Sequence, residues 1–399
     1  MNPSTSTPLL FQPFRLRNLT LKNRIMISPM GMFAGRDGQA TAFHLGHYGQ
    51  YAIGGAGMVM VEATAVERRG RIGHGDLGLW DDSQIAPLRQ VADLLRELGS
   101  VPAIQLAHSG HKGSSQSPWD GYATLTEADA ARGEAPWACV APSALPYAAG
   151  HPLPHALSLE EIEIVLDAWE AAARRARTAG FEVVEIHGAH GYLIHEFLSP
   201  LTNFRDDRYG GDLQGRMRFA LEVARRVRRA WPEDRPVLFR ASVIDGATQG
   251  WTLEDSAQLT RRLQALGIDM LACSSGGTAG LDRSQALPRE PGFQVFLSSG
   301  IKARTGALTV AVGLITEARQ AEEILQKGEA DLIAIARMAL YDPYWPLHAA
   351  LTLGVDPGYE KWPPQYGWWL ERWARTVAKH PATEGLLTPV LRAVDSRRP

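Results

Sequence analysis

Short apolar runs alternate with amphipathic segments along most of this sequence. Eight runs of five to nine residues are rich in Val, Ile, Leu, Ala and Met, a composition typical of buried parallel strands. Apolar residues at every third or fourth position mark the segments between these runs, and this spacing predicts amphipathic helices. The predicted strands are 24–30, 58–66, 102–108, 183–187, 237–243, 270–275, 308–313 and 332–337.

Several of the predicted helices have recognisable ends. Ser158 and Glu161 form a capping box, and Gly180 and Pro232 each end a helical pattern. The predicted helices are 41–53, 82–98, 158–178, 216–230, 253–266, 292–303, 316–327 and 344–353. Eight strands alternating with helices predict an α/β fold of the (β/α)8 TIM-barrel type rather than an open doubly wound sheet.

Three segments stand outside this alternation. Residues 15–22 have the pattern of a small hairpin, and 111–156 have no regular period but many Pro, Gly, Ser and aromatic residues. A connection of that length inside a compact domain is usually functional, so we expect 111–156 to form a cap over the barrel mouth. We therefore predict one barrel domain, 9–356, followed by a C-terminal extension, 357–399.

Composition narrows the class of protein. The 399 residues include 45% hydrophobic and 21% charged residues, with a formal net charge of −2, which disfavours a nucleic-acid partner. The two cysteines, Cys139 and Cys273, are too few for a disulfide framework or a multi-cysteine metal site. No apolar stretch reaches membrane-spanning length and the N-terminal residues lack a secretory pattern, so we expect no membrane association and a cytoplasmic location.

Candidate chemistry is concentrated where the predicted strand 183–187 ends. His187 and His190 lie three residues apart, and Tyr192 follows them. In (β/α)8 barrels such strand ends meet at the mouth, where the two imidazoles could donate to one oxygen and the phenol could supply a proton. Two other interpretations remain open from these residues alone: a metal-dependent hydrolase or lyase site built on the histidine pair, or simple core packing.

Two arginines occupy other strand ends. Arg240 lies inside an apolar strand, where a charge needs either a structural salt bridge or an electron-rich ligand, and both interpretations remain open. Arg337 ends the eighth predicted strand and Gly313 ends the seventh. Because barrels commonly hold phosphate at these two loops, we expect a phosphate site there.

The sequence resembles the old yellow enzyme family of flavin-dependent ene-reductases. The resemblance covers roughly residues 9–370 and is most specific in 184–206 (VEIHGAHGYLIHEFLSPLTNFRD) and 209–211 (YGG). Its details are similar to the thermophilic-like class III subgroup and the xenobiotic reductase A branch. Further matching segments are 23–30 (NRIMISPM), 104–108 (IQLAH), 141–143 (APS), 321–332 (AEEILQKGEADL), 118–121 (PWDG) and 366–372 (YGWWLER).

The resemblance implies FMN bound across the barrel mouth. Gln105 would contact the pyrimidine edge and Arg240 the N1 and C2-carbonyl region, while Gly313, Ala336 and Arg337 would hold the phosphate. The residues implied along the flavin ring are Ser28, Pro29, Met30, Gly31 and Ala63.

The resemblance also implies the reaction. His187 and His190 would bind the carbonyl or nitro oxygen of an activated alkene, and Tyr192 would protonate the neighbouring carbon after hydride transfer from the flavin. NADPH or NADH would use the same mouth first, in ping-pong turnover. A flavin barrel acting as a desaturase or as a binding protein is the alternative within this fold.

The sequence departs from the family pattern at four positions. Gly31 replaces a cysteine near the flavin, and Phe33 replaces a substrate-binding tyrosine. His111 replaces an arginine and Ala336 a glycine. The first two changes affect the expected redox potential and substrate range.

Relatives in this subgroup lend C-terminal residues across a dimer interface. Residues 362–369 (WPPQYGWW) are read here as a stiff aromatic strip. We therefore expect Trp369 to bind substrate at a neighbouring subunit's mouth, in a homodimer or a homotetramer built from dimers.

Overall fold

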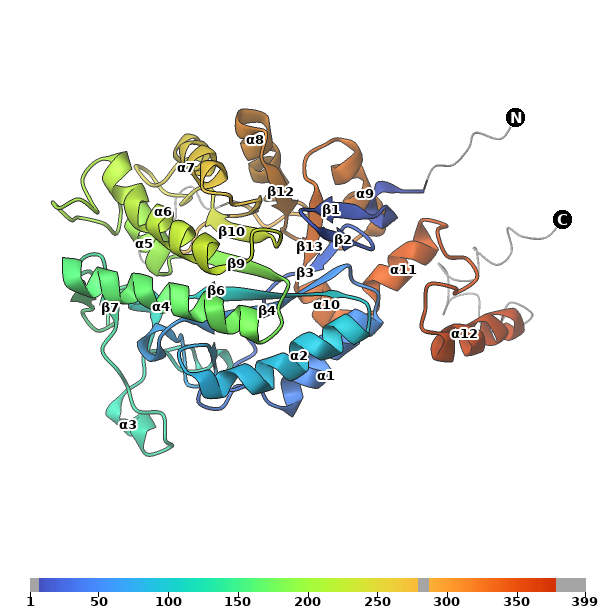
Figure 1. The fold of residues 1–399 in the computed structure, drawn as a ribbon, viewed down its shortest axis with the longest axis horizontal. Coiled ribbons are helices and arrows are strands. Elements are labelled where there is room, and N and C mark those ends of the chain that lie inside the picture. Colours follow the sequence, from blue (N-terminus) through green and yellow to red (C-terminus); the bar gives the residue numbers. More distant parts are fainter. Residues whose placement is uncertain (1–6, 279–286, 378–399) are drawn as a thin grey trace.

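The computed structural model describes residues 7–278 and 287–377, and within them eight parallel strands close into a barrel (Figure 1). The strands follow the order β3-β13-β12-β11-β10-β9-β6-β4, and β3 pairs with β4 to close the ring. Their bounds are β3 Ile25–Ile27, β4 Met58–Ala65, β6 Val101–Ala107, β9 Val183–Gly188, β10 Val237–Ser242, β11 Met270–Ser274, β12 Leu308–Ala311 and β13 Leu332–Ile335. The predicted (β/α)8 fold is confirmed.

All eight predicted helices are present, with ends within three residues of the expected ones. They are α1 Ala42–Ile53, α2 Ile85–Glu97, α4 Leu159–Thr178, α6 Leu213–Ala230, α7 Leu253–Ala265, α8 Val295–Thr305, α9 Ala318–Gln326 and α11 Trp345–Thr352. The capping box at Ser158 forms as expected, since its hydroxyl accepts from the Glu161 amide at 3.1 Å. Three short helices were not predicted, α3 Glu127–Ala130, α5 Leu193–Leu198 and α10 Arg337–Tyr341, because four to six residues are too few to display a helical period.

The first and last barrel strands are shorter than the apolar pattern suggested. β3 ends at Ile27 and β13 at Ile335, so Ser28, Pro29 and Met30 lie in a loop and Arg337 begins α10. The apolar character continues past the last ladder hydrogen bond because the loop residues still pack against the barrel top. Strand length therefore cannot be read from hydrophobicity at this edge.

A hairpin closes the amino-terminal end of the barrel. β1 (Phe14–Leu16) and β2 (Leu19–Leu21) pair antiparallel, as predicted for 15–22. Leu16 and Leu21 belong to the same buried apolar cluster as the barrel-interior residues Met26, Met58 and Leu238. With one end of the barrel filled by these side chains, a ligand site is left to the carboxyl-terminal end.

The segment 111–156 contains only short elements. α3 (Glu127–Ala130) projects from the barrel at the lower left of Figure 1, and β7 (Val140–Ala141) pairs with β8 (His155–Ala156). Its function as a cap stays a prediction, although two of its residues reach the barrel mouth as described below.

The aromatic C-terminal segment, predicted only as a stiff strip beyond the last barrel helix, lies mostly in a helix. α12 (Pro364–Val377) begins at a proline, which is compatible with a first helical turn because that position needs no amide donor. Tyr359 and Trp362, just before α12, are buried against Leu347 and Leu351 of α11. In Figure 1 α12 lies on the side of the molecule opposite α3, and residues 378–399 of the predicted extension lie outside the described residues.

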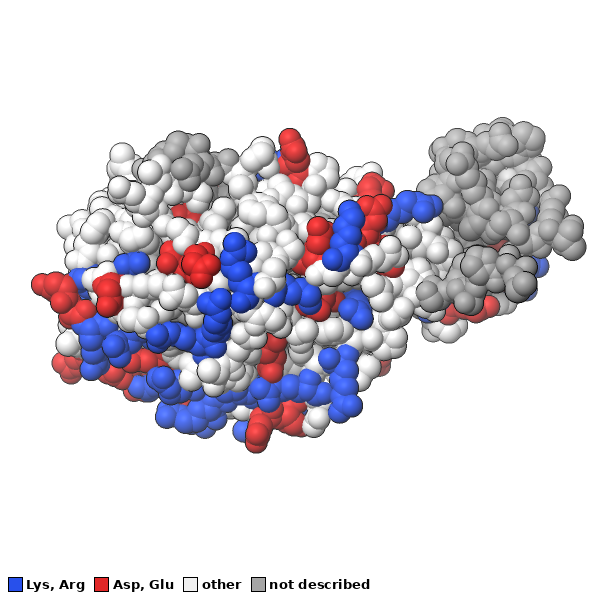
Figure 2. Space-filling model, turned by 90° about the horizontal axis from the view of Figure 1, so that it is seen from above, with Lys and Arg blue, Asp and Glu red and all other residues white. Residues whose placement is uncertain are grey.

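Charged side chains of both signs are interspersed on the face seen in Figure 2. Helix α6 carries a basic cluster, Arg225, Arg226, Arg228 and Arg229, and two of these arginines pair with acids of α4. Arg226 Nη2 lies 2.7 Å from Glu163 Oε2, and Arg229 pairs with Glu170. The cluster thus joins two neighbouring barrel helices instead of forming a free basic surface. Within the described ranges, none of the helices combines the length and apolar character needed to cross a membrane.

Candidate active site

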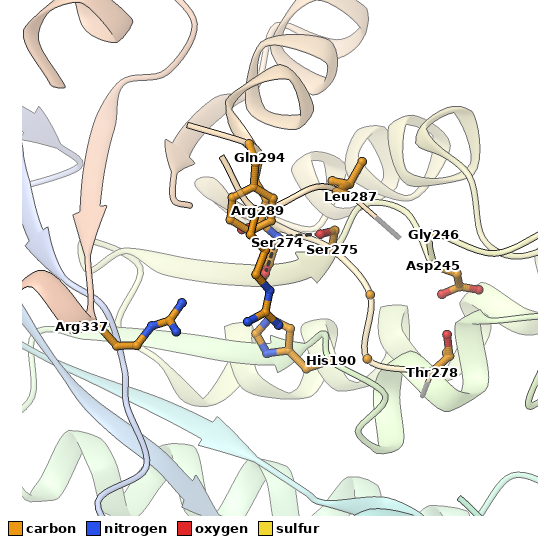
Figure 3. A pocket seen from close by; sticks show the side chains of 13 residues that line it. His190, Asp245, Gly246, Ser274, Ser275, Thr278, Leu287, Arg289, Gln294 and Arg337 are labelled. Atoms are coloured by element: carbon orange, nitrogen blue, oxygen red, sulfur yellow. Dashed lines mark hydrogen bonds between the residues drawn. The ribbon is translucent and has the colours of Figure 1, made fainter. Parts of the chain in front are cut away.

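Two adjoining cavities open at the carboxyl ends of the strands, and His190 lines both. The central cavity has a volume of about 330 Å³ and the lateral cavity about 490 Å³. The central cavity is lined by Pro29, Gly31, Phe33, Ala63, Ile72, Gln105, Pro118, Tyr122, His187, His190, Tyr192 and Arg240. The lateral cavity is lined by His190, Asp245, Gly246, 274–278, Leu287, Arg289, Phe293, Gln294 and Arg337 (Figure 3).

Most of the site residues proposed from the sequence converge here. Nine of them line the central cavity: Pro29, Gly31, Phe33, Ala63, Gln105, His187, His190, Tyr192 and Arg240. Arg337 lines the lateral cavity. Five others line neither cavity: Ser28, Met30, Gly313, Ala336 and Trp369.

A tight turn after β9 presents the two histidines and the tyrosine. His190 and Gly191 both adopt positive φ, +60° and +72°, and Tyr192 then caps α5. The His187 ring lies 5.1 Å from that of His190 and 5.0 Å from that of Tyr192, both perpendicular. The two adjacent strands hold His190, because its amide donates to Ser242 Oγ at 2.9 Å and its Nε2 lies 2.7 Å from Ser274 Oγ.

Burial keeps all three groups uncharged near neutral pH. It lowers the pKa of His187 and of His190 well below the ordinary value, and the Arg240 charge lowers both further. Burial also raises the pKa of the Tyr192 phenol well above its usual value. His187 Nδ1 accepts from the Ala189 amide at 3.2 Å, so the ring proton is carried by Nε2. The turn therefore offers neutral hydrogen-bond donors and a protonated phenol.

Arg240 is a buried cation without a carboxylate partner. Among the described residues no ion pair joins it to an acid, and its Nε has no hydrogen-bond partner. Nη1 donates to Ser28 Oγ at 3.3 Å, and burial lowers the pKa of the guanidinium while the charge of Glu185 raises it. No carboxylate therefore forms a contact ion pair with Arg240, and its buried charge and unpartnered Nε suit an anionic or strongly dipolar ligand in the cavity that it lines.

Glu185 orients the neighbouring amide of Gln105. The two residues pair in register on β9 and β6, and Gln105 Nε2 donates to Glu185 Oε1 at 2.7 Å. Because the carboxylate accepts this hydrogen bond, the Gln105 side-chain NH₂ must point toward Glu185, and the side-chain carbonyl oxygen is left to accept from a ligand. The sequence did not point to Glu185, because its partner is 80 positions away on the neighbouring strand.

Polar groups line the lateral cavity. Figure 3 shows Arg337 reaching into it from the end of β13, and no ion pair joins Arg337 to another described residue. Gln294 Nε2 donates to Ser275 Oγ at 2.6 Å, beside Ser274. Gly313 lies against Gln294, whose Cβ would be 3.1 Å from a Cβ added at Gly313, and its carbonyl accepts from the Gly292 amide at 2.8 Å. Gln294 was missed because it precedes a helix and carries no motif.

The segment 111–156 supplies two residues to the central cavity, Pro118 and Tyr122. Lys112 was also missed: its Nζ donates to the carbonyls of His190 at 2.7 Å and Gly277 at 3.0 Å. It lies 5.2 Å from the Tyr192 ring centroid, so its charge is close to the phenol. A lysine in an irregular segment has no sequence feature that marks such a contact.

Three of the positions that depart from the family pattern, Gly31, Phe33 and His111, can be described by their neighbours in the structure. A Cβ added at Gly31 would meet only the Phe33 ring, at 3.4 Å, so the absence of a side chain is not forced by crowding. Phe33 and Trp119 make an edge-to-face contact at 6.1 Å, which leaves this wall apolar. His111 lies outside both cavities, and its amide donates to the buried Glu196 at 3.0 Å.

A metal ion bound by His187 and His190 would need further ligands beside them. Within the described ranges no group of three or more His, Cys, Asp or Glu side chains is arranged to hold a metal ion. Hydrogen bonds engage His187 Nδ1 and His190 Nε2, as described above.

Comparisons with known proteins agree with this site. Residues 9–354 match the NADH:flavin oxidoreductase / NADH oxidase family. The chain is 42% identical over 349 residues to an NADPH dehydrogenase from Bacillus cytotoxicus, covering 87% of this chain and 93% of that protein. The old yellow enzyme homologue from Zymomonas mobilis superposes with a TM-score of 0.70 and 29% identity, over 86% of this chain and 92% of that one.

A larger protein shares the fold. 2-Naphthoyl-CoA reductase, in complex with 2-naphthoyl-CoA, superposes with a TM-score of 0.76 at 24% identity and covers 86% of this chain. This chain spans only 52% of that protein's length, so the likeness concerns the fold alone.

The side chains present fit FMN. Arg240, whose Nε has no hydrogen-bond partner, and Gln105 both line the central cavity, where an electron-poor ring system with carbonyl and imide groups finds matching donors and acceptors. Arg337 supplies a cation at the lateral cavity for a phosphate. The chain belongs to the NADH:flavin oxidoreductase / NADH oxidase family and is an FMN-dependent oxidoreductase of the old yellow enzyme type, with a reduced nicotinamide as electron donor.

Proposed function

We propose that this enzyme reduces activated C=C bonds, in enones, maleimides and nitroalkenes, at the expense of NADPH or NADH. The observation that carries the proposal is the convergence of two neutral imidazoles and one neutral phenol on a single cavity. Bound FMN supplies the chemistry of hydride transfer, receiving the electrons from the nicotinamide and passing them to the alkene.

His187 and His190 bind the substrate oxygen in this proposal. Negative charge grows on a carbonyl or nitro oxygen when hydride reaches the β-carbon, and donors placed at that oxygen lower the barrier. The perpendicular rings, 5.1 Å apart, can direct two N–H groups to one oxygen atom. His187 already holds its proton on Nε2, so it donates without a change of charge.

Tyr192 supplies the proton for the α-carbon. Its raised pKa keeps the phenol protonated until charge develops on the substrate, which suits a general acid in a buried site. Lys112, 5.2 Å from the ring centroid, stabilises the phenolate that remains after transfer. In the same cavity, the apolar rings of Phe33 and Pro118 favour apolar substrate carbon on that side.

A steady-state screen tests the proposal. Cyclohexenone, N-methylmaleimide and a nitroalkene are each mixed with NADPH or NADH, and both nicotinamide oxidation and the saturated product are measured. We expect stoichiometric alkene reduction with at least one pair. Nicotinamide oxidation that yields only reduced oxygen, or an alkane oxidised to an alkene, would instead indicate an oxidase or a desaturase.

We further propose that α12 covers the mouth of a neighbouring subunit, with Trp369 against its substrate. Tyr366, Trp369 and Trp373 recur at spacings of three and four on one helix face and are all exposed, Trp369 by 65%. The adjoining side of the helix packs on α11 through Ala374 and Leu370, and Tyr366 at its edge contacts the Tyr344 ring. An exposed aromatic face of this kind is typical of an interface between subunits.

Replacing both Trp369 and Trp373 with serine is expected to weaken dimerisation and raise the KM for alkenes. The reason is that large aromatic side chains at an interface centre carry about 2 kcal/mol or more each. Sedimentation velocity and steady-state kinetics measure the two effects. Truncation after Asp356 is a poorer test, because it would also expose Leu347 and Leu351. A double variant that stays dimeric with unchanged KM would show that α12 is surface padding.

A further inference from the structure

A buried pair, His195 and Asp245, lies directly behind the turn that carries His190 and Tyr192. Both side chains are fully buried, and His195 Nε2 lies 2.7 Å from Asp245 Oδ1. Among the described residues no third group hydrogen-bonds to either of these two atoms, so this 2.7 Å contact is the polar contact that each of them makes. On its other side the His195 ring receives the Gly191 amide, which donates to Nδ1 at 2.8 Å.

These contacts determine the tautomer of His195. A backbone amide can only donate, so Nδ1 must carry a lone pair and the ring proton must lie on Nε2. Asp245 is the acceptor for that proton. Burial opposes the ionisation of Asp245, but the pairing with His195 and hydrogen bonds from Ser199 and Trp251 hold the pKa of this carboxyl below its ordinary value.

The Gly191 amide belongs to a turn with little freedom to relax. A Cβ added at Gly191 would lie 2.1 Å from the carbonyl oxygen of Gly277, so the turn packs closely against the loop after β11. His190 is a non-glycine residue with φ of +60°, a conformation that persists only when surrounding contacts over-determine it. A displacement at Gly191 therefore moves the His190 ring and the Tyr192 phenol together.

We propose that Asp245 and His195 are positioning residues for alkene reduction. The Asp245 carboxylate selects the Nε2–H tautomer of His195, so that Nδ1 can accept from the Gly191 amide. This hydrogen bond fixes the turn and therefore the positions of His190 and Tyr192. The kinetic part of this inference rests on the proposed function, whereas the tautomer of His195 does not. Figure 3 shows Asp245 at the edge of the lateral cavity, away from Arg337, and its Oδ1 lies 2.7 Å from His195 Nε2.

Asp245→Asn is a sharp test because the orientation of the new amide is dictated by the chain. The Trp251 amide donates to Oδ2 at 2.7 Å, so the asparagine oxygen must occupy that position. The asparagine NH₂ then faces His195 Nε2, which must accept. The ring proton moves to Nδ1, where it opposes the Gly191 N–H, and two donors are left facing each other.

Ser199→Ala is the matched control. Ser199 Oγ donates to the same carboxylate oxygen at 2.6 Å, but its removal leaves His195 Nε2–H and Asp245 unchanged. Both variants are prepared as FMN-loaded holoenzymes. Nitrogen-15 NMR of the imidazole side chains, assigned with a His195→Gln sample, reports the tautomer, and the flavin absorbance change on adding 4-hydroxybenzaldehyde reports ligand affinity.

We expect the Nε2–H tautomer in the wild type and in Ser199→Ala, and the Nδ1–H tautomer in Asp245→Asn. In Asp245→Asn the buried Gly191 amide has no acceptor, which weakens the turn. The affinity for 4-hydroxybenzaldehyde should therefore fall about tenfold or more, and kcat for alkene reduction should fall more than KM changes. An Nδ1–H tautomer in the wild type overturns the inference even if the variant does not fold. A changed tautomer with unchanged phenol affinity and kcat also overturns it. If the wild-type enzyme reduces no alkene, the proposed function is refuted, but the NMR spectra and the affinity for 4-hydroxybenzaldehyde still test whether Asp245 and His195 position the turn.

Discussion

Replacing either His187 or His190 with alanine is expected to slow alkene reduction about a hundredfold while FMN stays bound. Loss of one donor to a developing oxyanion typically costs about 3 kcal/mol, which corresponds to roughly a hundredfold in rate. Both side chains line the central cavity, and both are neutral donors whose pKa is lowered by burial. Stopped-flow measurement of flavin reoxidation by cyclohexenone isolates the step in which these residues act.

Two controls separate this role from a structural one. His187→Asn keeps an N–H donor and should retain more activity than His187→Ala. Ser275→Ala removes a hydroxyl that lines only the lateral cavity, and it should leave reoxidation by cyclohexenone unchanged. Reoxidation at the wild-type rate in both alanine variants would remove the histidines from the reaction. Loss of activity on treatment with metal chelators would point instead to a metal-dependent site.

Arg240→Met is expected to weaken FMN binding by about ten- to a hundredfold without destabilising the apoprotein. The interactions that we expect to be lost are charge-assisted hydrogen bonds from Arg240 to the flavin, worth roughly 1.5–3 kcal/mol. In the apoprotein, by contrast, Arg240 is a buried cation with no carboxylate partner among the described residues, and its removal relieves a desolvation cost. Titration of FMN fluorescence gives the dissociation constant, and urea unfolding of the apoprotein gives its free energy of unfolding.

Glu185 allows this substitution to be tolerated. Burial raises the pKa of this carboxyl and the Arg240 charge lowers it, so without the arginine Glu185 can take up a proton and stay buried in neutral form. Arg240→Lys, which keeps a charge but loses the planar fork, is the matched comparison and should fall between the wild type and Arg240→Met. A destabilised apoprotein with unchanged FMN affinity would contradict this assignment and restore a structural role for Arg240.

The sequence by itself determined the architecture. Eight apolar runs separated by amphipathic segments allow few arrangements, and a closed parallel barrel buries all of them while keeping its connections short. Because every strand of such a barrel ends at the same mouth, residues at the strand ends were brought together without knowledge of their contacts. His187 and Arg240 were identified in this way, and both line the central cavity.

The tertiary structure decided which partners these residues have. Arg240 could have been paired or unpaired, and only the packed barrel leaves its Nε without a partner. Gln105 is oriented by Glu185, and His195 by Asp245, through contacts that span 80 and 50 positions of the chain. Such pairs depend on barrel register and loop path, neither of which leaves a periodic pattern in the sequence.

Local conformation could not be predicted from the sequence where local propensity competes with the burial of side chains. Residues 362–369 are rich in aromatics and prolines, and the sequence suggested only a stiff strip there, yet Pro364 starts α12 because a proline fits the first turn of a helix. The burial of Tyr359 and Trp362 against α11 fixes where that helix begins. Propensity is worth only a fraction of a kcal/mol per residue, so the larger free energy of burying these rings determines the outcome.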